Sequence, residues 1–222
     1  MDEKVAAIQK TLENYRAQGK SMFATSSFQS HSIPMLHIIS RLDKSIPIYF
    51  LNTGFLFPET FIFKEELSEL LGLKIIGVQS AVPKSQQKDE NGQLLFTSDP
   101  DYCCFLNKVQ PMEPLLSKYD VWINGIRADQ NANRANMKEE QESSNGAMRY
   151  HPMLHWTSKE IFEYRKKYNL PSHPLEQQGY LSIGCEPCTK KMEVGLDERH
   201  ARWFGLNKTE CGLHTDLIKE KE

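Results

Sequence analysis

The sequence predicts an α/β fold with an open, mainly parallel, twisted sheet that is flanked by helices. Short apolar segments typical of strands alternate along the chain with segments of helical periodicity. Polar or glycine-containing loops follow these strands, at the edge where open α/β sheets bind ligands. We expect all of residues 1–222 to form a single domain, with residues 205–222 as a C-terminal tail.

Helices and strands are expected in regular alternation. The expected helices cover residues 4–17, 33–42 and about 58–71, and the last begins with a proline, which suits a first helical position. The expected strands cover residues 22–24, 46–51, 74–78 and 120–125. Right-handed crossovers between such strands make a parallel sheet. A capping-box pattern that starts at Thr157 predicts a further helix to about Tyr168.

Two polar stretches separate the later elements. Residues 84–97 are rich in Gln, Lys, Asp and Gly, and we expect a solvated, mobile loop there. Residues 128–146 contain almost no apolar side chains, and they follow Arg127 at the end of an expected strand. This second stretch is therefore expected to be either a plain loop or a lid that a ligand orders.

Composition argues against some broad classes of function. The formal net charge of −2 argues against a general nucleic-acid surface, although a nucleotide needs only a few local basic groups. No apolar run is long enough to cross a bilayer, and the first residues lack the layout of a signal peptide. We therefore expect a cytoplasmic protein that binds neither nucleic acid nor membrane.

Four of the five cysteines form two pairs that suit a metal site. Cys185 and Cys188 are spaced as C-x-x-C, and Cys103 and Cys104 are adjacent. In a reducing compartment such thiols serve metal binding or catalysis rather than disulfides. An iron–sulfur cluster, a zinc ion and unliganded thiols all remain open from spacing alone, although an adjacent pair fits a zinc site poorly.

The fifth cysteine, Cys211, lies in a polar C-terminal segment. A lone cysteine is more often a small buried apolar residue than a nucleophile, but this segment offers little core in which to bury it. Nearby Lys208 and His214 are expected to favour the thiolate, and Gly212 allows the backbone to turn. These features favour a nucleophilic role for Cys211.

The cysteine pattern resembles that of the assimilatory adenylyl-sulfate reductases, within the wider adenylyl- and phosphoadenylyl-sulfate reductase family. The resemblance covers about residues 26–214 and is most specific in the segment Glu210-Cys211-Gly212-Leu213-His214. Further matching motifs are Asn52-Thr53-Gly54, Phe57-Pro58-Glu59-Thr60, Asp99-Pro100-Asp101, Gly125-x-Arg127-x-Asp129-Gln130 and Glu198-Arg199-x-x-Arg202-Trp203. The resemblance implies an adenine nucleotide alpha-hydrolase-like, or Rossmann-like, fold with a mobile C-terminal tail.

The resemblance also implies a role for each candidate site residue. A [4Fe–4S] cluster would be held by Cys103, Cys104, Cys185 and Cys188, and catalysis would use Cys211, His214 and Lys108. Substrate would be bound by Ser26, Ser27, Ser30, Thr53, Gly54, Arg127, Arg199 and Arg202. We expect Arg199 and Arg202 to share one helix face, since they are three residues apart. The serines open a helix whose N-terminal amides suit a phosphate.

The reaction implied by the resemblance is the reduction of adenosine 5′-phosphosulfate to sulfite and AMP in sulfate assimilation. The Cys211 thiolate would attack the sulfate sulfur and carry a cysteine S-sulfonate. Thioredoxin, or a glutaredoxin-like donor, would then release sulfite, because the cysteine count leaves no resolving thiol in the chain. The oligomeric state is left open, with a homo-oligomer among the alternatives.

Three other functions stay open at this point. The first is reduction of the 3′-phosphorylated nucleotide, phosphoadenylyl sulfate, alone or together with the unphosphorylated form. A more remote one is an ATP pyrophosphatase of the PP-loop type, such as a tRNA sulfurtransferase, but residues 26–31 lack the glycines and the aspartate of its nucleotide loop. The third is a zinc-stabilised nucleotide-binding module, which leaves Cys211 without a purpose.

Overall fold

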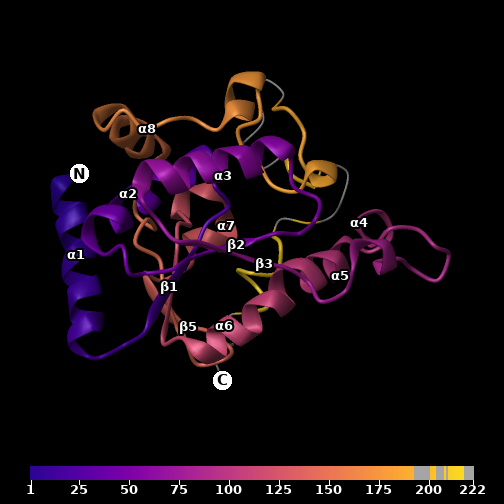
Figure 1. The fold of residues 1–222 in the computed structure, drawn as a ribbon, viewed down its shortest axis with the longest axis horizontal. Coiled ribbons are helices and arrows are strands. Elements are labelled where there is room, and N and C mark those ends of the chain that lie inside the picture. The colour runs from indigo at the N-terminus through magenta and orange to yellow at the C-terminus, as the bar shows by residue number, and fades with distance from the viewer. Residues whose placement is uncertain (193–200, 204–207, 209, 218–222) are drawn as a thin grey trace.

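The computed structural model describes residues 1–192, 201–203, 208 and 210–217 (Figure 1). The described residues form a six-stranded sheet in the order β3-β2-β1-β4-β6-β5. Its strands are β1 Met22–Thr25, β2 Ile48–Leu51, β3 Ile75–Val78, β4 Val121–Asn124, β5 Glu140–Glu142 and β6 Met148–Tyr150. Within this sheet only β5 and β6 pair in antiparallel fashion. The predicted open, mainly parallel sheet is confirmed.

Helices cover both faces of the sheet (Figure 1). The longer ones are α1 Asp2–Ala17, α2 Ile33–Leu42, α3 Pro58–Leu71 and α8 Ser158–Lys167, close to the predicted ranges. Helix α8 begins with the predicted capping box, in which Thr157 Oγ1 accepts the Glu160 N–H at 3.2 Å and Glu160 accepts the Thr157 N–H at 2.8 Å. Three shorter helices are α4 Leu95–Ser98, α5 Pro100–Cys104 and α6 Glu113–Lys118.

The two polar stretches hold different amounts of regular secondary structure, and residues 87–94 of the first form the predicted loop. Residues 84–97 hold a 3-10 turn at Lys84–Gln86 and the start of α4. Residues 128–146 hold helix α7, Ala132–Ala135, and strand β5. Residues 128–146 are therefore not a plain loop, because pairing of β5 with β6 orders residues whose composition alone indicates a loop. The alternative expectation, a lid that a ligand orders, stays a prediction.

Alternating side chains of the central strands bury two apolar layers. Ala24, Phe50 and Ile123 face the layer that helices α1, α2, α3 and α8 complete. On the other side, Trp122 of β4 packs in a layer with apolar side chains of α6. Leu217 from the C-terminal segment is buried in this second layer, so the described part of that segment packs against the domain.

No helix in the described ranges is long and apolar enough to span a membrane.

Candidate functional site

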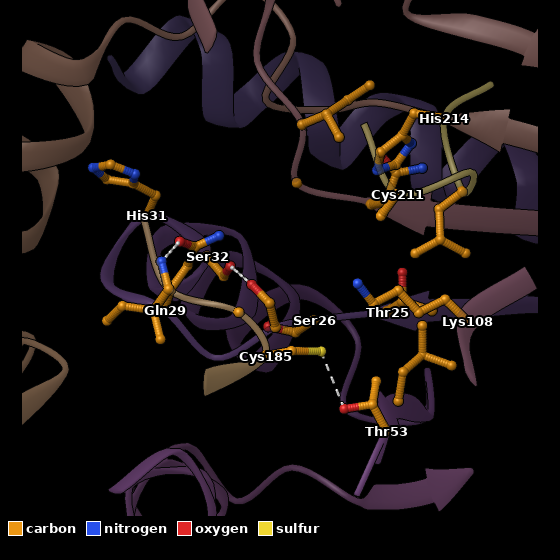
Figure 2. Close-up of a pocket in the computed structure, with 18 of the residues that line it drawn as sticks. Thr25, Ser26, Gln29, His31, Ser32, Thr53, Lys108, Cys185, Cys211 and His214 are labelled. Atoms are coloured by element: carbon orange, nitrogen blue, oxygen red, sulfur yellow. Dashed lines mark hydrogen bonds between the residues drawn. The ribbon is translucent and has the colours of Figure 1, made fainter. Parts of the chain in front are cut away.

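A cleft of about 1110 Å³, including its open mouth, lies at the carboxyl ends of β1, β2 and β4 (Figure 2). This is the edge at which open α/β sheets bind ligands. The predicted site residues that line it are Ser26, Ser27, Thr53, Lys108, Cys185, Arg202, Cys211 and His214. The fold therefore brings together side chains from segments that lie far apart in the sequence.

The loop after β1 provides two serines to the cleft. Ser26 Oγ accepts the backbone N–H of Phe28 at 3.0 Å, and an accepting hydroxyl can still donate its own proton to a ligand. Ser27 Oγ lies 3.2 Å from Ser32 Oγ, at the entrance to α2. Ser30 does not line the cleft, because its buried Oγ accepts the backbone N–H of His173 at 3.0 Å. Ser30 instead anchors the loop.

The turn after β2 holds two residues that were predicted to bind substrate, Thr53 and Gly54, and only Thr53 lines the cleft. Thr53 lines the cleft, and its Oγ1 lies 3.3 Å from Cys185 Sγ. Gly54 lies outside the cleft lining, with its N–H bonded to Asn52 Oδ1 at 3.0 Å and its φ at +74°. Its carbonyl accepts a hydrogen bond from Lys84 Nζ at 3.0 Å. Gly54 thus shapes the turn that presents Thr53.

The three predicted arginines have different positions. Arg202 lines the cleft, and it pairs with Thr189 in an isolated β-bridge, so its expected place on a helix face is wrong. Arg127 is buried away from the cleft, where Nε donates to Asp129 Oδ1 at 2.9 Å and Nη2 to Ser158 Oγ at 2.8 Å. Arg199 lies outside the described residues.

Cys211 and His214 reach the cleft from the C-terminal segment, and Figure 2 shows them side by side at one end of it. Gly212 has a φ of +84°, a left-handed conformation that glycine adopts readily, as the predicted turn requires. The His214 ring stacks on Trp122 with 6.1 Å between ring centroids. Its Nδ1 lies 2.9 Å from Arg149 Nη2, and because a guanidinium only donates, Nδ1 is the acceptor.

Lys108 lies between the cleft and the cysteine pairs. It belongs to a π-helical turn, Phe105–Val109, that continues α5 and brings Nζ within 3.6 Å of Cys104 Sγ. Burial lowers the pKa of Lys108, but electrostatic interaction with the sulfurs of Cys185, Cys211 and Cys104 raises it by more, so the net pKa is above its usual value. The ammonium group therefore keeps its charge beside the sulfurs.

The other four cysteines line a second, smaller cavity next to the cleft. Cys103, Cys104, Cys185 and Cys188 share this cavity with apolar side chains that include Phe55 and Phe96. Burial, followed by the charges of Cys104 and Cys185, raises the pKa of Cys103 to about 11. Burial likewise raises the pKa of Cys104 and of Cys188. Thiols in such surroundings hold a proton unless a metal cation replaces it.

The four-thiol donor set suits a metal–sulfur group, since soft thiolates bind iron and zinc. The apolar lining suits it also, because such surroundings exclude water from a site. Over the described ranges, no group of three Cys, His, Asp or Glu side chains is arranged as a metal-binding group. The chemistry of the donors fits a cluster, and their assembly around it stays a prediction.

Sequence reasoning missed two arginines that contact the Cys211 segment. Arg134 lines the cleft and forms an ion pair with Glu210 at 2.7 Å. Arg149, in β6, contacts His214 as described above. Neither carries a signal in the sequence, because Arg134 lies in a polar stretch and Arg149 in a strand of three residues. The partners of these arginines, Glu210 and His214, do lie in the Glu-Cys-Gly-Leu-His segment that the sequence singled out.

Comparisons with known proteins agree with this architecture. The family model described as phosphoadenosine phosphosulfate reductase domain matches residues 21–191. An adenosine 5′-phosphosulfate reductase of Halalkalibacterium halodurans is 36% identical over 90% of this chain and 87% of its own. Adenosine 5′-phosphosulfate reductase 1 of Bacillus subtilis is 38% identical over 90% and 87%.

A solved structure shares the fold. The phosphoadenylyl-sulfate reductase of Candida auris, in a phosphate complex, superposes with a TM-score of 0.66 at 20% identity and covers 81% of this chain and 88% of that one. This likeness supports the nucleotide alpha-hydrolase type of sheet. Since the family model spans most of the chain and the bacterial relatives match nine tenths of it, the chain belongs to the phosphoadenosine phosphosulfate reductase domain family.

Proposed function

We propose that this chain reduces adenosine 5′-phosphosulfate to sulfite and AMP. The observation that carries the proposal is the meeting of one nucleophile, Cys211, with two cationic side chains, Lys108 and Arg202, in the cleft. The serine loop and the amides that open α2 supply donors for the nucleotide phosphate. The substrate choice is supported by the bacterial relatives, which are named as reductases of this nucleotide.

The first step is an attack of the Cys211 thiolate on a sulfur that carries anionic oxygens. A bond forms between Cys211 Sγ and the sulfonyl sulfur, and the bond from that sulfur to the bridging oxygen breaks. The electron pair of the broken bond leaves on the phosphate oxygen of AMP. Repulsion between the thiolate and the sulfonyl oxygens opposes the attack, and Lys108 and Arg202 lower that repulsion because their charges are in place beforehand.

His214 is a candidate hydrogen-bond donor in this step. Because Nδ1 accepts from Arg149, the neutral imidazole carries its proton on Nε2. The ring stacked on Trp122 is held at the cleft, where an Nε2–H suits a sulfonyl oxygen. A His214→Gln variant retains an amide donor, so we expect it to keep more activity than His214→Ala.

We propose that Cys103, Cys104, Cys185 and Cys188 hold a [4Fe–4S] cluster. The proposal is supported by four thiols around one apolar-lined cavity and by Lys108, whose Nζ lies 3.6 Å from Cys104 Sγ. When bound, the cluster would supply a fixed negative charge that orients the Lys108 ammonium. Assays of iron and acid-labile sulfide on the purified protein test this, and zinc found in their place would contradict it.

The second step needs an external dithiol, for which we propose thioredoxin or a glutaredoxin-like donor. A donor thiolate attacks Cys211 Sγ, the S–S bond to the sulfonate breaks, and its electron pair leaves with sulfite. The donor's second thiol then resolves the mixed disulfide and restores the Cys211 thiolate. The donor dithiol is thereby oxidised to a disulfide, while the substrate sulfur is reduced by two electrons.

Sulfite release from adenosine 5′-phosphosulfate with reduced thioredoxin tests the proposal directly. Because the matching family model is described by the 3′-phosphorylated nucleotide, that nucleotide is the second arm of the assay. Faster turnover of the second nucleotide would replace the proposed substrate. Release from neither nucleotide, with an intact cluster and active thioredoxin, would contradict the proposed function.

The proposed function also implies a cellular compartment. We place the reaction in the cytoplasm, because a reducing compartment keeps cysteines available for metal binding and catalysis. One domain over residues 1–222 stays a prediction, and the oligomeric state stays open, with a homo-oligomer among the alternatives. Light scattering on the purified protein measures the oligomeric state.

A further inference from the structure

We infer that two buried arginines, Arg134 and Arg149, dock the C-terminal segment on both sides of Cys211 and so hold its thiol in the cleft. Arg134 contacts the residue before Cys211, and Arg149 contacts residues two and three positions after it. The inference rests on the proposed function, since it concerns the placement of the proposed nucleophile. Both arginines would act as positioning residues.

The upstream contact is a buried, bidentate ion pair. Arg134 Nε donates to Glu210 Oε1 at 2.7 Å and Nη2 to Glu210 Oε2 at 3.1 Å. Both side chains are less than a tenth exposed, and Asn131 Nδ2 adds a hydrogen bond to Glu210 Oε1 at 2.7 Å. Gln130 Oε1 accepts from Arg134 on its other side. Because separating a buried pair leaves an uncompensated charge, Glu210 is held firmly in place.

The downstream contact uses an arginine that is fully buried. Arg149 Nη2 lies 2.9 Å from His214 Nδ1 and donates to the Leu213 carbonyl at 3.3 Å, while the guanidinium lies 5.0 Å from the centroid of Trp122. Within the described residues, no carboxylate pairs with Arg149, and its Nε and Nη1 have no acceptor. Burying an unpaired guanidinium charge costs free energy, and the hydrogen bonds that the Arg149 side chain does form within the described residues are all to the C-terminal segment. Arg149 is therefore placed to hold that segment.

The backbone between the two contacts has little freedom. A Cβ on Gly212 would lie 2.7 Å from Asp216 Oδ2 and 2.9 Å from Val109 Cγ2, so the bend fits closely against the domain. Lys208, further upstream, also pairs with Asp101 of α5. With Glu210 and His214 both fixed, the bend at Gly212 determines where Cys211 Sγ points.

The two chemical steps make opposite demands on this docking. Formation of the S-sulfonate needs Cys211 inside the cleft, whereas discharge needs a protein thiol to reach the same sulfur. Loss of either arginine contact should therefore slow the first step and leave the second unharmed. A purely structural arginine would show no such separation between the steps.

The experiment compares Arg134→Gln, Arg149→Lys and Glu210→Gln with the wild-type holoenzyme. The first readout is the alkylation rate of Cys211 by iodoacetamide, measured by mass spectrometry of the C-terminal peptide, and we expect it to rise roughly tenfold, equivalent to about 1.4 kcal/mol of docking free energy. The second is single-turnover S-sulfonate formation with adenosine 5′-phosphosulfate, expected to slow about 100-fold, as displacement of a reacting group by about 1 Å can cause. Discharge of preformed S-sulfonate by dithiothreitol should not slow.

The matched control is Arg165→Gln. Arg165 is also buried and pairs with Glu176 at 3.3 Å, and its described polar contacts lie within residues 172–176, remote from Cys211 in the sequence. This variant should lose thermal stability without a change in either Cys211 readout. It therefore separates loss of docking from general destabilisation.

The outcomes distinguish the docking from the reaction. Wild-type rates of alkylation and S-sulfonate formation in Arg134→Gln and Arg149→Lys would overturn the inference. Faster alkylation in these variants, with no S-sulfonate in the wild type, would support the docking and contradict the proposed function. If Arg149→Lys fails to fold, Glu210→Gln tests the docking by a change in the C-terminal segment itself. An unchanged alkylation rate of Cys211 in Glu210→Gln would count against docking.

Discussion

Replacing Gly184 with alanine should displace Arg202 in the cleft without unfolding the chain. An alanine Cβ there would lie 2.2 Å from Nη2, 2.4 Å from Cζ and 2.5 Å from Nη1 of Arg202. Ordinary contacts begin near 3.4 Å, so the guanidinium must move by about 1.2 Å. Gly184 does not have a positive φ, so alanine adds no backbone strain. The cost falls on the end of one flexible side chain.

The size of the effect follows from what Arg202 is proposed to do. Hydrogen bonds to a charged group contribute roughly 1.5–3 kcal/mol, and their complete loss corresponds to a factor of about 10 to 150 in rate. A displacement of about 1 Å can by itself cost about 100-fold. We therefore expect kcat/KM for sulfite release to fall by roughly 10- to 100-fold in Gly184→Ala. The melting temperature should change by only a few degrees.

A matched glycine tests this reasoning. Gly77 in β3 also lacks a positive φ, and a Cβ there meets nothing within 4 Å, so Gly77→Ala should retain wild-type turnover. Arg202→Ala shows the kcat/KM that remains when the guanidinium is removed completely. Wild-type kcat/KM in Gly184→Ala, alongside an impaired Arg202→Ala, would refute the claim that close approach over Gly184 positions the guanidinium.

Three further predictions follow from the site and the core. Lys108→Met should lower kcat/KM by about 100-fold, because it removes a charge next to the nucleophile, while the iron content stays unchanged; loss of iron would instead make Lys108 a structural residue. Cys211→Ser should yield no S-sulfonate by mass spectrometry, and a sulfonate on another cysteine would contradict the assigned nucleophile. Burial lowers the pKa of His151 from 6.5 to about 3. Between pH 6.5 and pH 3 the unfolded chain therefore binds a proton at His151 that the folded chain does not, and the free energy of unfolding falls as the pH falls. Urea unfolding should show a loss of about 2 kcal/mol from His151 between about pH 7 and 5, and an unchanged pH slope in His151→Asn would show that His151 is not the cause.

Local signals predicted the helices well. Helix α3 begins at Pro58, as expected for a proline in a first turn, and ends at Leu71 before Gly72, whose φ is +60°. The capping box at Thr157 likewise marked the start of α8. These signals work because each one acts through hydrogen bonds and backbone angles within a few residues.

Strands β5 and β6 show where local signals end. Each has three residues, and Glu-Gln-Glu in β5 has neither apolar content nor β propensity. Their conformation comes from pairing, in which Arg149 of β6 lies beside Trp122 of β4. A polar edge strand of this kind is stabilised by its neighbour, and its own sequence does not specify it.

The candidate site shows the same difference between features that local sequence specifies and features that packing specifies. The reactive groups could be predicted from the sequence alone, namely five thiols in a specific pattern and a bend at Gly212 beside Cys211, because residue type and local spacing define them. The cations that lie near those thiols could be identified only from the folded chain. The tertiary structure placed Arg202, Arg134 and Lys108 at the cleft and buried Arg127 elsewhere, because proximity and burial arise from packing between distant segments rather than from spacing along the chain.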